Sequence, residues 1–318
     1  MQHTTSLSNV GLVFSTPRKL PRAGSLRGRV VVLDLAFASN ATKNGFERIT
    51  LRFIEELGNR LAAWIDHHDH DEHARFLSDS RFILCNKSDH GACPELITPD
   101  LRRCIGPVDT IVCHTDFDGI ASAAKWLRDG IEPYEGCDSD ARAIDTRIGK
   151  PSAIADTIDR ALRARPHDNA LFGLVIRHLA NGLADASLWL PVREAADELD
   201  EIEAATRTLA QAYCRVPPGV AVIDISKPHP RIDKTLMLLI GQQRENIAMI
   251  LDRQTINIAT SFDSGINLVK LLGLSGGMPT RVSIPSESLP LACHALGVDP
   301  TNIEEIIGHS QLESQRGR

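Results

Sequence analysis

The chain has 318 residues, of which 42% are hydrophobic and 24% are charged, and its formal net charge is −6. This composition is ordinary for a globular protein, and the length is sufficient for two compact domains. The acidic balance argues against an extended groove for long nucleic acid, because phosphate contacts need clustered Lys and Arg. A short oligonucleotide or a small phosphate ester remains compatible with it.

Location and redox state also follow from composition. No stretch is long and apolar enough to cross a bilayer, and residues 1–16 lack the basic start and apolar centre of a secretory signal. We therefore expect a soluble, cytoplasmic protein without a membrane partner. The seven cysteines have no paired spacing, so they predict reduced thiols, not a disulfide framework or a zinc ribbon.

Three apolar runs in the first half predict buried strands at residues 30–33, 62–65 and 110–113, with helix-like patterns between and after them. Continuous apolar runs are typical of strands that are covered on both faces. We therefore expect an α/β fold, in which a mostly parallel sheet is flanked by helices.

Each predicted strand ends on an acid or a histidine. Asp34 follows the first, Asp66-His67-His68 the second, and His114-Thr115-Asp116-Phe117-Asp118-Gly119 the third. All three groups should project from one edge of the sheet, since ligand sites in open α/β sheets lie outside the carboxyl ends of the strands.

The later part of the chain predicts a change of domain. A charged segment with helical spacing follows residue 190, Pro217-Pro218-Gly219 interrupts it, and new strand-like runs begin at residues 220 and 256. We predict a metal-binding catalytic domain over residues 1–190, a connecting helix over 191–215, and a smaller α/β substrate-binding domain over 216–318.

The third group is the strongest local signal, because it places one imidazole and two carboxylates within one tight turn. Gly119 should allow a sharp turn, and the following helix should direct its N-terminal N–H groups at an anion. The alternative is an ordinary strand-to-helix turn in which Asp116 or Asp118 only caps the helix.

The second group lies in a run rich in His and Asp, in which we interpret His70 and His73 as a solvated stretch beyond the strand. Carboxylates and imidazoles from separate strands suit a pair of Mn²⁺ or Mg²⁺ ions. Two such ions lower the pKa of a bridging water and clamp both oxygens of an in-line phosphoryl displacement. No cysteine is placed to favour zinc.

These motifs resemble those of the DHH phosphoesterases, which include single-strand exonucleases, nanoRNA and cyclic-dinucleotide phosphodiesterases, and manganese pyrophosphatases. The resemblance covers most of the chain. It rests on residues 112–123, the strand ending in Asp34, Asp66-His67-His68, Asp145, residues 258–262 and 267–269, and Gly276-Gly277.

The resemblance implies that His114 and Asp116 bind one ion, that Asp118, His67 and Asp145 bind a second, and that Asp34 bridges them. Manganese is preferred and magnesium is the alternative. His68 would face the scissile phosphate, and Asp66 would orient a histidine by accepting its other ring N–H. Gly276 and Gly277 would let substrate approach the backbone, with Arg281 supplying charge.

The sequence departs from that family in two respects. Asp34 and Asp66-His67-His68 precede His114, whereas the family begins with the H-x-D-x-D-G motif. Because of this rearranged order, the assignment of Asp145 has an alternative, and Asp140 is the nearest substitute. Met278 also stands where the family has a histidine.

We expect hydrolysis of a phosphodiester in a short or cyclic nucleotide, or in a related small phosphate ester. A homodimer is compatible with the sequence. One alternative is a haloacid-dehalogenase-type phosphatase with Asp116 as the nucleophile, which the strand followed by Asp116-Phe117-Asp118-Gly119 resembles. The other is a catalytically silent nucleotide sensor or scaffold of the same fold.

Overall fold

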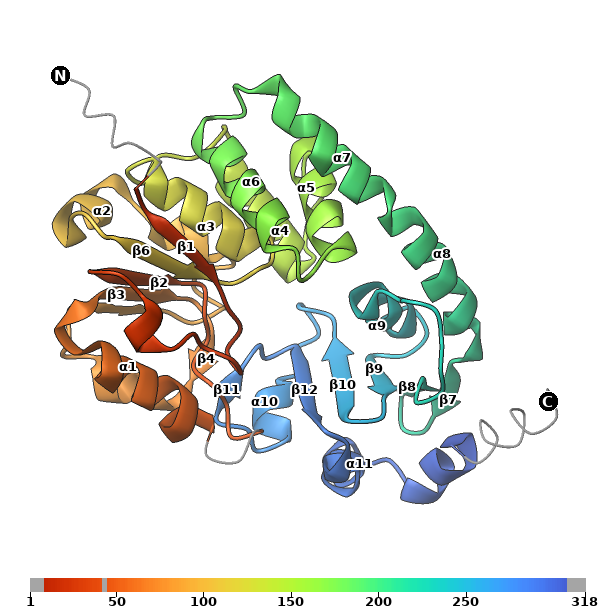
Figure 1. Cartoon of the computed structure of the whole chain (residues 1–318). Coiled ribbons are helices and arrows are strands. Elements are labelled where there is room, and N and C mark those ends of the chain that lie inside the picture. The colour runs from red at the N-terminus through yellow and green to blue at the C-terminus, as the bar shows by residue number, and fades with distance from the viewer. Residues whose placement is uncertain (1–8, 42–44, 308–318) are drawn as a thin grey trace. The chain divides into compact units, whose positions relative to one another are not determined.

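The computed structural model describes residues 9–41 and 45–307 (Figure 1). The described residues form two units, the first from residues 9–38 and 45–199 and the second from residues 39–41 and 200–307. Each unit has its own sheet and hydrophobic core, and the predicted α/β class is confirmed. The first eight residues of the polar start lie outside the described residues.

The sheet of the first unit has five strands in the order β1-β6-β2-β3-β5, and every neighbouring pair is parallel. In chain order the strands are β1 (Gly11–Phe14), β2 (Val30–Leu33), β3 (Leu61–Asp66), β5 (Phe82–Leu84) and β6 (Thr110–Cys113). The short strand β4 (Asp69–His70) lies outside this sheet. The three predicted strands are thus its three central ones.

Helices cover both faces of this sheet, which explains the continuous apolar strands (Figure 1). Val31 and Leu33 of β2 pack into one core cluster, whereas Val30 and Val32 pack into another on the opposite face. α1 (Arg52–Leu57) contributes to the second cluster. The first cluster includes residues from α3 (Phe117–Leu127), α4 (Cys137–Thr146), α5 (Ala153–Ala164), α6 (Asn169–Ala180) and α7 (Trp189–Asp197), and α2 (Pro99–Ile105) packs against it.

The second unit has a mixed sheet in the order β12-β10-β9-β8-β7. β8 and β9 are parallel and are connected through α9 (Lys234–Gln242), while the other pairs are antiparallel. Its strands are β7 (Cys214–Val216), β8 (Val220–Asp224), β9 (Ile247–Leu251), β10 (Thr255–Thr260) and β12 (Arg281–Pro285). The remaining elements are α10 (Leu268–Leu271), β11 (Gly276–Gly277) and α11 (Leu289–Leu296).

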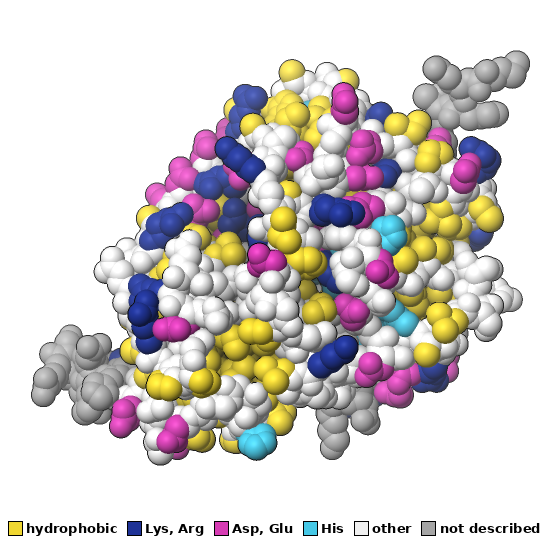
Figure 2. Space-filling model, turned by 180° about the vertical axis from the view of Figure 1, so that it is seen from behind, with side chains coloured by type: hydrophobic (Ala, Val, Ile, Leu, Met, Phe, Trp, Pro, Cys, Tyr) yellow, Lys and Arg dark blue, Asp and Glu magenta, His cyan; other side chains and the backbone are white. Residues whose placement is uncertain are grey.

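The stretch expected as one connecting helix contains the end of α7, then α8 (Leu199–Leu209), and the start of β7. α7 belongs to the first unit because Val192 and Ala195 are buried in the core of that unit. No helix in the described part of the chain has both the length and the apolar character needed to cross a membrane. On the face shown in Figure 2, Lys and Arg side chains of the described residues lie among Asp and Glu side chains.

Candidate metal centre

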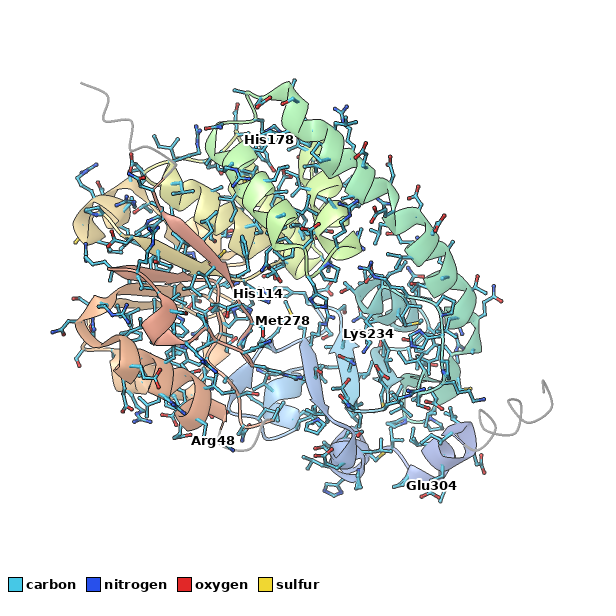
Figure 3. All side chains as sticks on the ribbon, in the orientation of Figure 1. Arg48, His114, His178, Lys234, Met278 and Glu304 are labelled. Atoms are coloured by element: carbon cyan, nitrogen blue, oxygen red, sulfur yellow. The ribbon has the colours of Figure 1, made fainter. Side chains whose placement is uncertain are left out.

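The predicted convergence of three strand ends is present in the structure. Leu33 of β2 is paired in register with Ile65 of β3 and with Cys113 of β6, so the residues that follow emerge at one edge of the sheet. They are Asp34, the Asp66-His67-His68 triplet, and His114, which Figure 3 labels.

Asp34 is at the centre of this group. Its backbone has a φ of 56°, a left-handed conformation that non-glycine residues rarely adopt, and its side chain is 1% exposed. Neither carboxylate oxygen makes a hydrogen bond within the described residues. Burial, with the nearby charges of Asp118 and Asp116, raises the pKa of Asp34 well above its usual value. A nearby cation would stabilise the ionised form of such a buried carboxylate.

His114 and Asp116 form one corner of the group with Asp34. Nδ1 of His114 lies 2.8 Å from Oδ2 of Asp116 and 3.8 Å from Oδ2 of Asp34, yet this nitrogen makes no hydrogen bond in the described part of the chain. Burial opposes the charged imidazole, but Asp116 outweighs burial and raises the pKa of His114 to about 9. These three residues offer donor atoms close enough to share one metal ion.

Asp116 also caps α3, because its Oδ1 accepts a hydrogen bond at 3.1 Å from the backbone N–H of Gly119. The capping interpretation therefore holds for one of its oxygens, and the other is directed at His114. Gly119 has a different role from the predicted one. A Cβ atom there would lie 2.7 Å from the carbonyl oxygen of His114, so close packing requires glycine at this position.

His67 forms the other corner. Its Nδ1 donates to the carbonyl of His90 at 2.9 Å, which directs Nε2 at Oδ2 of Asp118, 3.1 Å away, and of Asp145, 3.5 Å away. Nε2 also lies 3.4 Å from Oδ1 of Asp34. Burial lowers the pKa of His67, but Asp118 and Asp34 outweigh burial and raise it to about 10.

Asp145 projects from α4 into the corner of His67. The alternative, Asp140, is engaged elsewhere: it accepts hydrogen bonds from Tyr134 Oη at 2.8 Å and from the backbone N–H of Ser152 at 2.7 Å. Of these two acids, the structure therefore brings only Asp145 to the group.

Lys87 also belongs to this corner, although the sequence did not predict it. Its side chain is 1% exposed, its Nζ lies 3.1 Å from Nε2 of His67, and it forms an ion pair with Asp145. Burial lowers the pKa of Lys87, while Asp118 and Asp34 oppose that shift. The sequence did not predict strand β5, and Lys87 could not be placed without it, because Lys87 follows that strand by three residues.

Asp66 and His68 are paired beside this group. Nδ1 of His68 lies 2.8 Å from Oδ1 of Asp66 and must donate, because an ionised carboxylate only accepts. Burial lowers the pKa of His68 even though Asp66 favours its charged form. His68 is therefore a neutral ring with its Nε2 lone pair available.

His70 and His73 are not the solvated residues that we expected. The ring of Phe37 lies 5.6 Å from that of His70 and 5.0 Å from that of His73, centroid to centroid. The physical cause is that the chain after β3 packs back onto Phe37, which belongs to the second core cluster of the first unit.

The remaining predicted residues lie in the second unit. Gly276 and Gly277 form β11, and Gly277 has a φ of 127° that favours glycine. Arg281 begins β12, and its Nη1 donates to Oγ1 of Thr235 at 3.1 Å. Their part in substrate binding stays a prediction.

The donor set fits a hard divalent ion at Asp34, His114 and Asp116. Carboxylate oxygens and imidazole nitrogen are ligands of Mn²⁺ and Mg²⁺ sites, and the donor atoms of Asp34 and His114 are buried without hydrogen-bond partners among the described residues. The corner of His67, Asp118 and Asp145 has the same donor types but also contains Lys87.

No family model and no curated protein matches the chain. The pGpG-specific phosphodiesterase PggH from Vibrio cholerae is a similar solved structure, with 12% identity and a TM-score of 0.41 over 85% of this chain and 97% of that chain. The exonuclease RecJ bound to manganese is similar at 14% identity and a TM-score of 0.42, over 84% of this chain and 74% of that chain.

Proposed function

We propose that this chain is a metal-dependent phosphoesterase that hydrolyses a phosphodiester in a short or cyclic nucleotide, or in a related small phosphate ester. The observation that carries the proposal is Asp34, a buried carboxylate without a hydrogen-bond partner in the described residues, surrounded by donors from two other strand ends. The resemblance of these same motifs to the DHH phosphoesterases supports this reaction class.

Asp34, His114 and Asp116 would hold the ion, with manganese preferred and magnesium as the alternative. A bound divalent ion supplies a Lewis acid for a phosphoryl oxygen and lowers the pKa of coordinated water. The sequence predicts two ions, and the second would be held by His67, Asp118 and Asp145.

His68 is the residue that we assign to proton transfer. Asp66 fixes the ring through Nδ1, so Nε2 is the nitrogen that can accept a proton from water or return one to the leaving oxygen. The side chain of His68 is 18% exposed, which leaves an approach for substrate, whereas that of Asp66 is fully buried. Asp66 is therefore a positioning residue.

The test is hydrolysis of bis-p-nitrophenyl phosphate and of a panel of linear and cyclic dinucleotides, with Mn²⁺, Mg²⁺ or EDTA. We expect turnover that requires the metal and falls at least ~100-fold in Asp34→Asn, which keeps the side-chain volume and removes a charged ligand. The exposed residue Asp71 provides a control, Asp71→Asn, that should keep full activity.

Two other outcomes separate the alternatives. A covalent phosphoaspartate trapped at Asp116 would establish the haloacid-dehalogenase-type reaction instead. Folded protein that binds Mn²⁺ but hydrolyses nothing in the panel would favour the sensor or scaffold.

A further inference from the structure

The two corners of the metal centre differ in how their donor atoms are occupied. At the first corner, both oxygens of Asp34 and Nδ1 of His114 have no hydrogen-bond partner within the described residues. At the second corner, both oxygens of Asp118 accept from the backbone N–H of Cys93, at 2.9 and 3.2 Å. Oδ2 of Asp145 also has no hydrogen-bond partner among the described residues, but it is ion-paired with the amino group of Lys87.

The second corner contains a buried lysine, Lys87. It contacts two of the three donors there, Nε2 of His67 at 3.1 Å and the carboxylate of Asp145. Metal ions bind imidazole and carboxylate at about 2.0–2.2 Å. An ion among these donors would therefore overlap the position of the amino group.

The local chain holds Lys87 in this position. The carbonyl of Asn86 accepts hydrogen bonds from the N–H groups of Asp89 and His90, at 3.0 and 3.1 Å, which closes a tight turn around Lys87. The carbonyl of His90 in turn accepts from Nδ1 of His67. The turn that carries the lysine and the imidazole beside it are thus one hydrogen-bonded assembly.

Resting on the proposed function, we infer that the amino group of Lys87 takes the place of a second metal ion. The centre therefore binds one divalent ion, at Asp34, His114 and Asp116. Lys87 supplies the fixed positive charge among the carboxylates of Asp118 and Asp145 that a second ion would otherwise provide. This departs from the two ions expected from the sequence.

The experiment is to count bound Mn²⁺ in the full chain by equilibrium dialysis with elemental analysis, and to record its electron paramagnetic resonance spectrum. We expect one Mn²⁺ per wild-type chain, with the six-line spectrum of an isolated ion. Lys87→Ala vacates the second corner and should raise the count to two, with a spectrum broadened by coupling between neighbouring ions.

The matched control is Lys125→Ala, which also removes a buried lysine that pairs with an acid. Nζ of Lys125 bonds to Asp138 at 2.5 Å and to the carbonyl of Pro94 at 2.9 Å, away from the metal centre. This variant should keep one Mn²⁺ per chain, so a gain in Lys87→Ala cannot be attributed to general loosening of the fold.

Two Mn²⁺ with a coupled spectrum in the wild type would overturn the inference and leave the proposed function standing. A count of one in both the wild type and folded Lys87→Ala would also overturn it, because Lys87 would not be what keeps the second ion out. No binding in either would contradict the proposed metal dependence itself. If Lys87→Ala does not fold, the wild-type count alone decides.

Discussion

The environment of a single residue, Asp34, favours a bound cation. Its carboxylate is buried, its backbone is in the left-handed region, and its oxygens have no hydrogen-bond partner in the described part of the chain. Burying a charge without a partner costs free energy, and so does a non-glycine residue with positive φ. Without a bound ion, we expect this residue to destabilise the fold that positions it.

Asp34→Asn should therefore have opposite effects with and without metal. In EDTA the variant should be more stable than the wild type by ~1–2 kcal/mol, since an amide is cheaper to bury than a carboxyl group whose ionised form burial disfavours. With saturating Mn²⁺ it should gain little, because a ligand has been lost. Urea unfolding under both conditions measures this, and a variant less stable in EDTA would contradict it.

The raised pKa values of His67 and His114 predict a pH dependence of the metal-free protein. Both are protonated in the folded state up to about 10 and 9, whereas unfolded histidine titrates near 6.5. Their stabilisation is therefore complete below pH 6.5 and is lost as the pH rises to about 9 and 10. Melting temperatures in EDTA should fall over this range.

Added Mn²⁺ should reverse that trend, because metal binding needs neutral imidazole and strengthens as the pH rises. The control is His114→Gln in EDTA. Its melting temperature should fall less steeply between pH 7 and 9 than that of the wild type. Parallel curves for the two proteins would show that His114 is not the group that titrates.

At the scale of an element, the turn from β6 into α3 depends on the contact between Gly119 and His114. Alanine normally stabilises a helix by about 1 kcal/mol relative to glycine. Here a Cβ would meet both the backbone oxygen and the Cβ of His114, at 2.7 and 2.8 Å.

Gly119→Ala should consequently destabilise the protein by ~1–3 kcal/mol and weaken Mn²⁺ binding, because His114 must move. Gly24→Ala is the matched control, since a Cβ there would have nothing within 4 Å. Chemical unfolding and Mn²⁺ titration of both variants test this, and a stabilised Gly119→Ala would refute the steric account.

The strength of the local pattern decided which elements could be predicted from the sequence. The central strands β2, β3 and β6 are continuous apolar runs buried on both faces, so their position and the acids after them could be predicted. β5 has only three half-buried residues, and without it nothing placed Lys87 beside His67. Packing of His70 and His73 against Phe37 depends on tertiary contacts that no local pattern encodes.

At the scale of the whole molecule, the two units have separate sheets and separate cores, and the proposed metal ligands all belong to the first. A ligand stabilises only the folded unit that binds it, by about 2.7 kcal/mol at 100 times its Kd. Differential scanning calorimetry should resolve two transitions, of which Mn²⁺ raises one. A single transition that shifts as a whole would show that the units unfold together.

The strand order β1-β6-β2 also has a consequence for biosynthesis. β1 and β2 leave the ribosome early, but they are not neighbours, and the strand that joins them, Thr110–Cys113, is made about eighty residues after β2. Until then each of them has an open edge of the kind that recruits foreign strands. The nascent chain therefore has a long interval in which a chaperone is of use, and the proposed metal site is incomplete until β6 has been inserted.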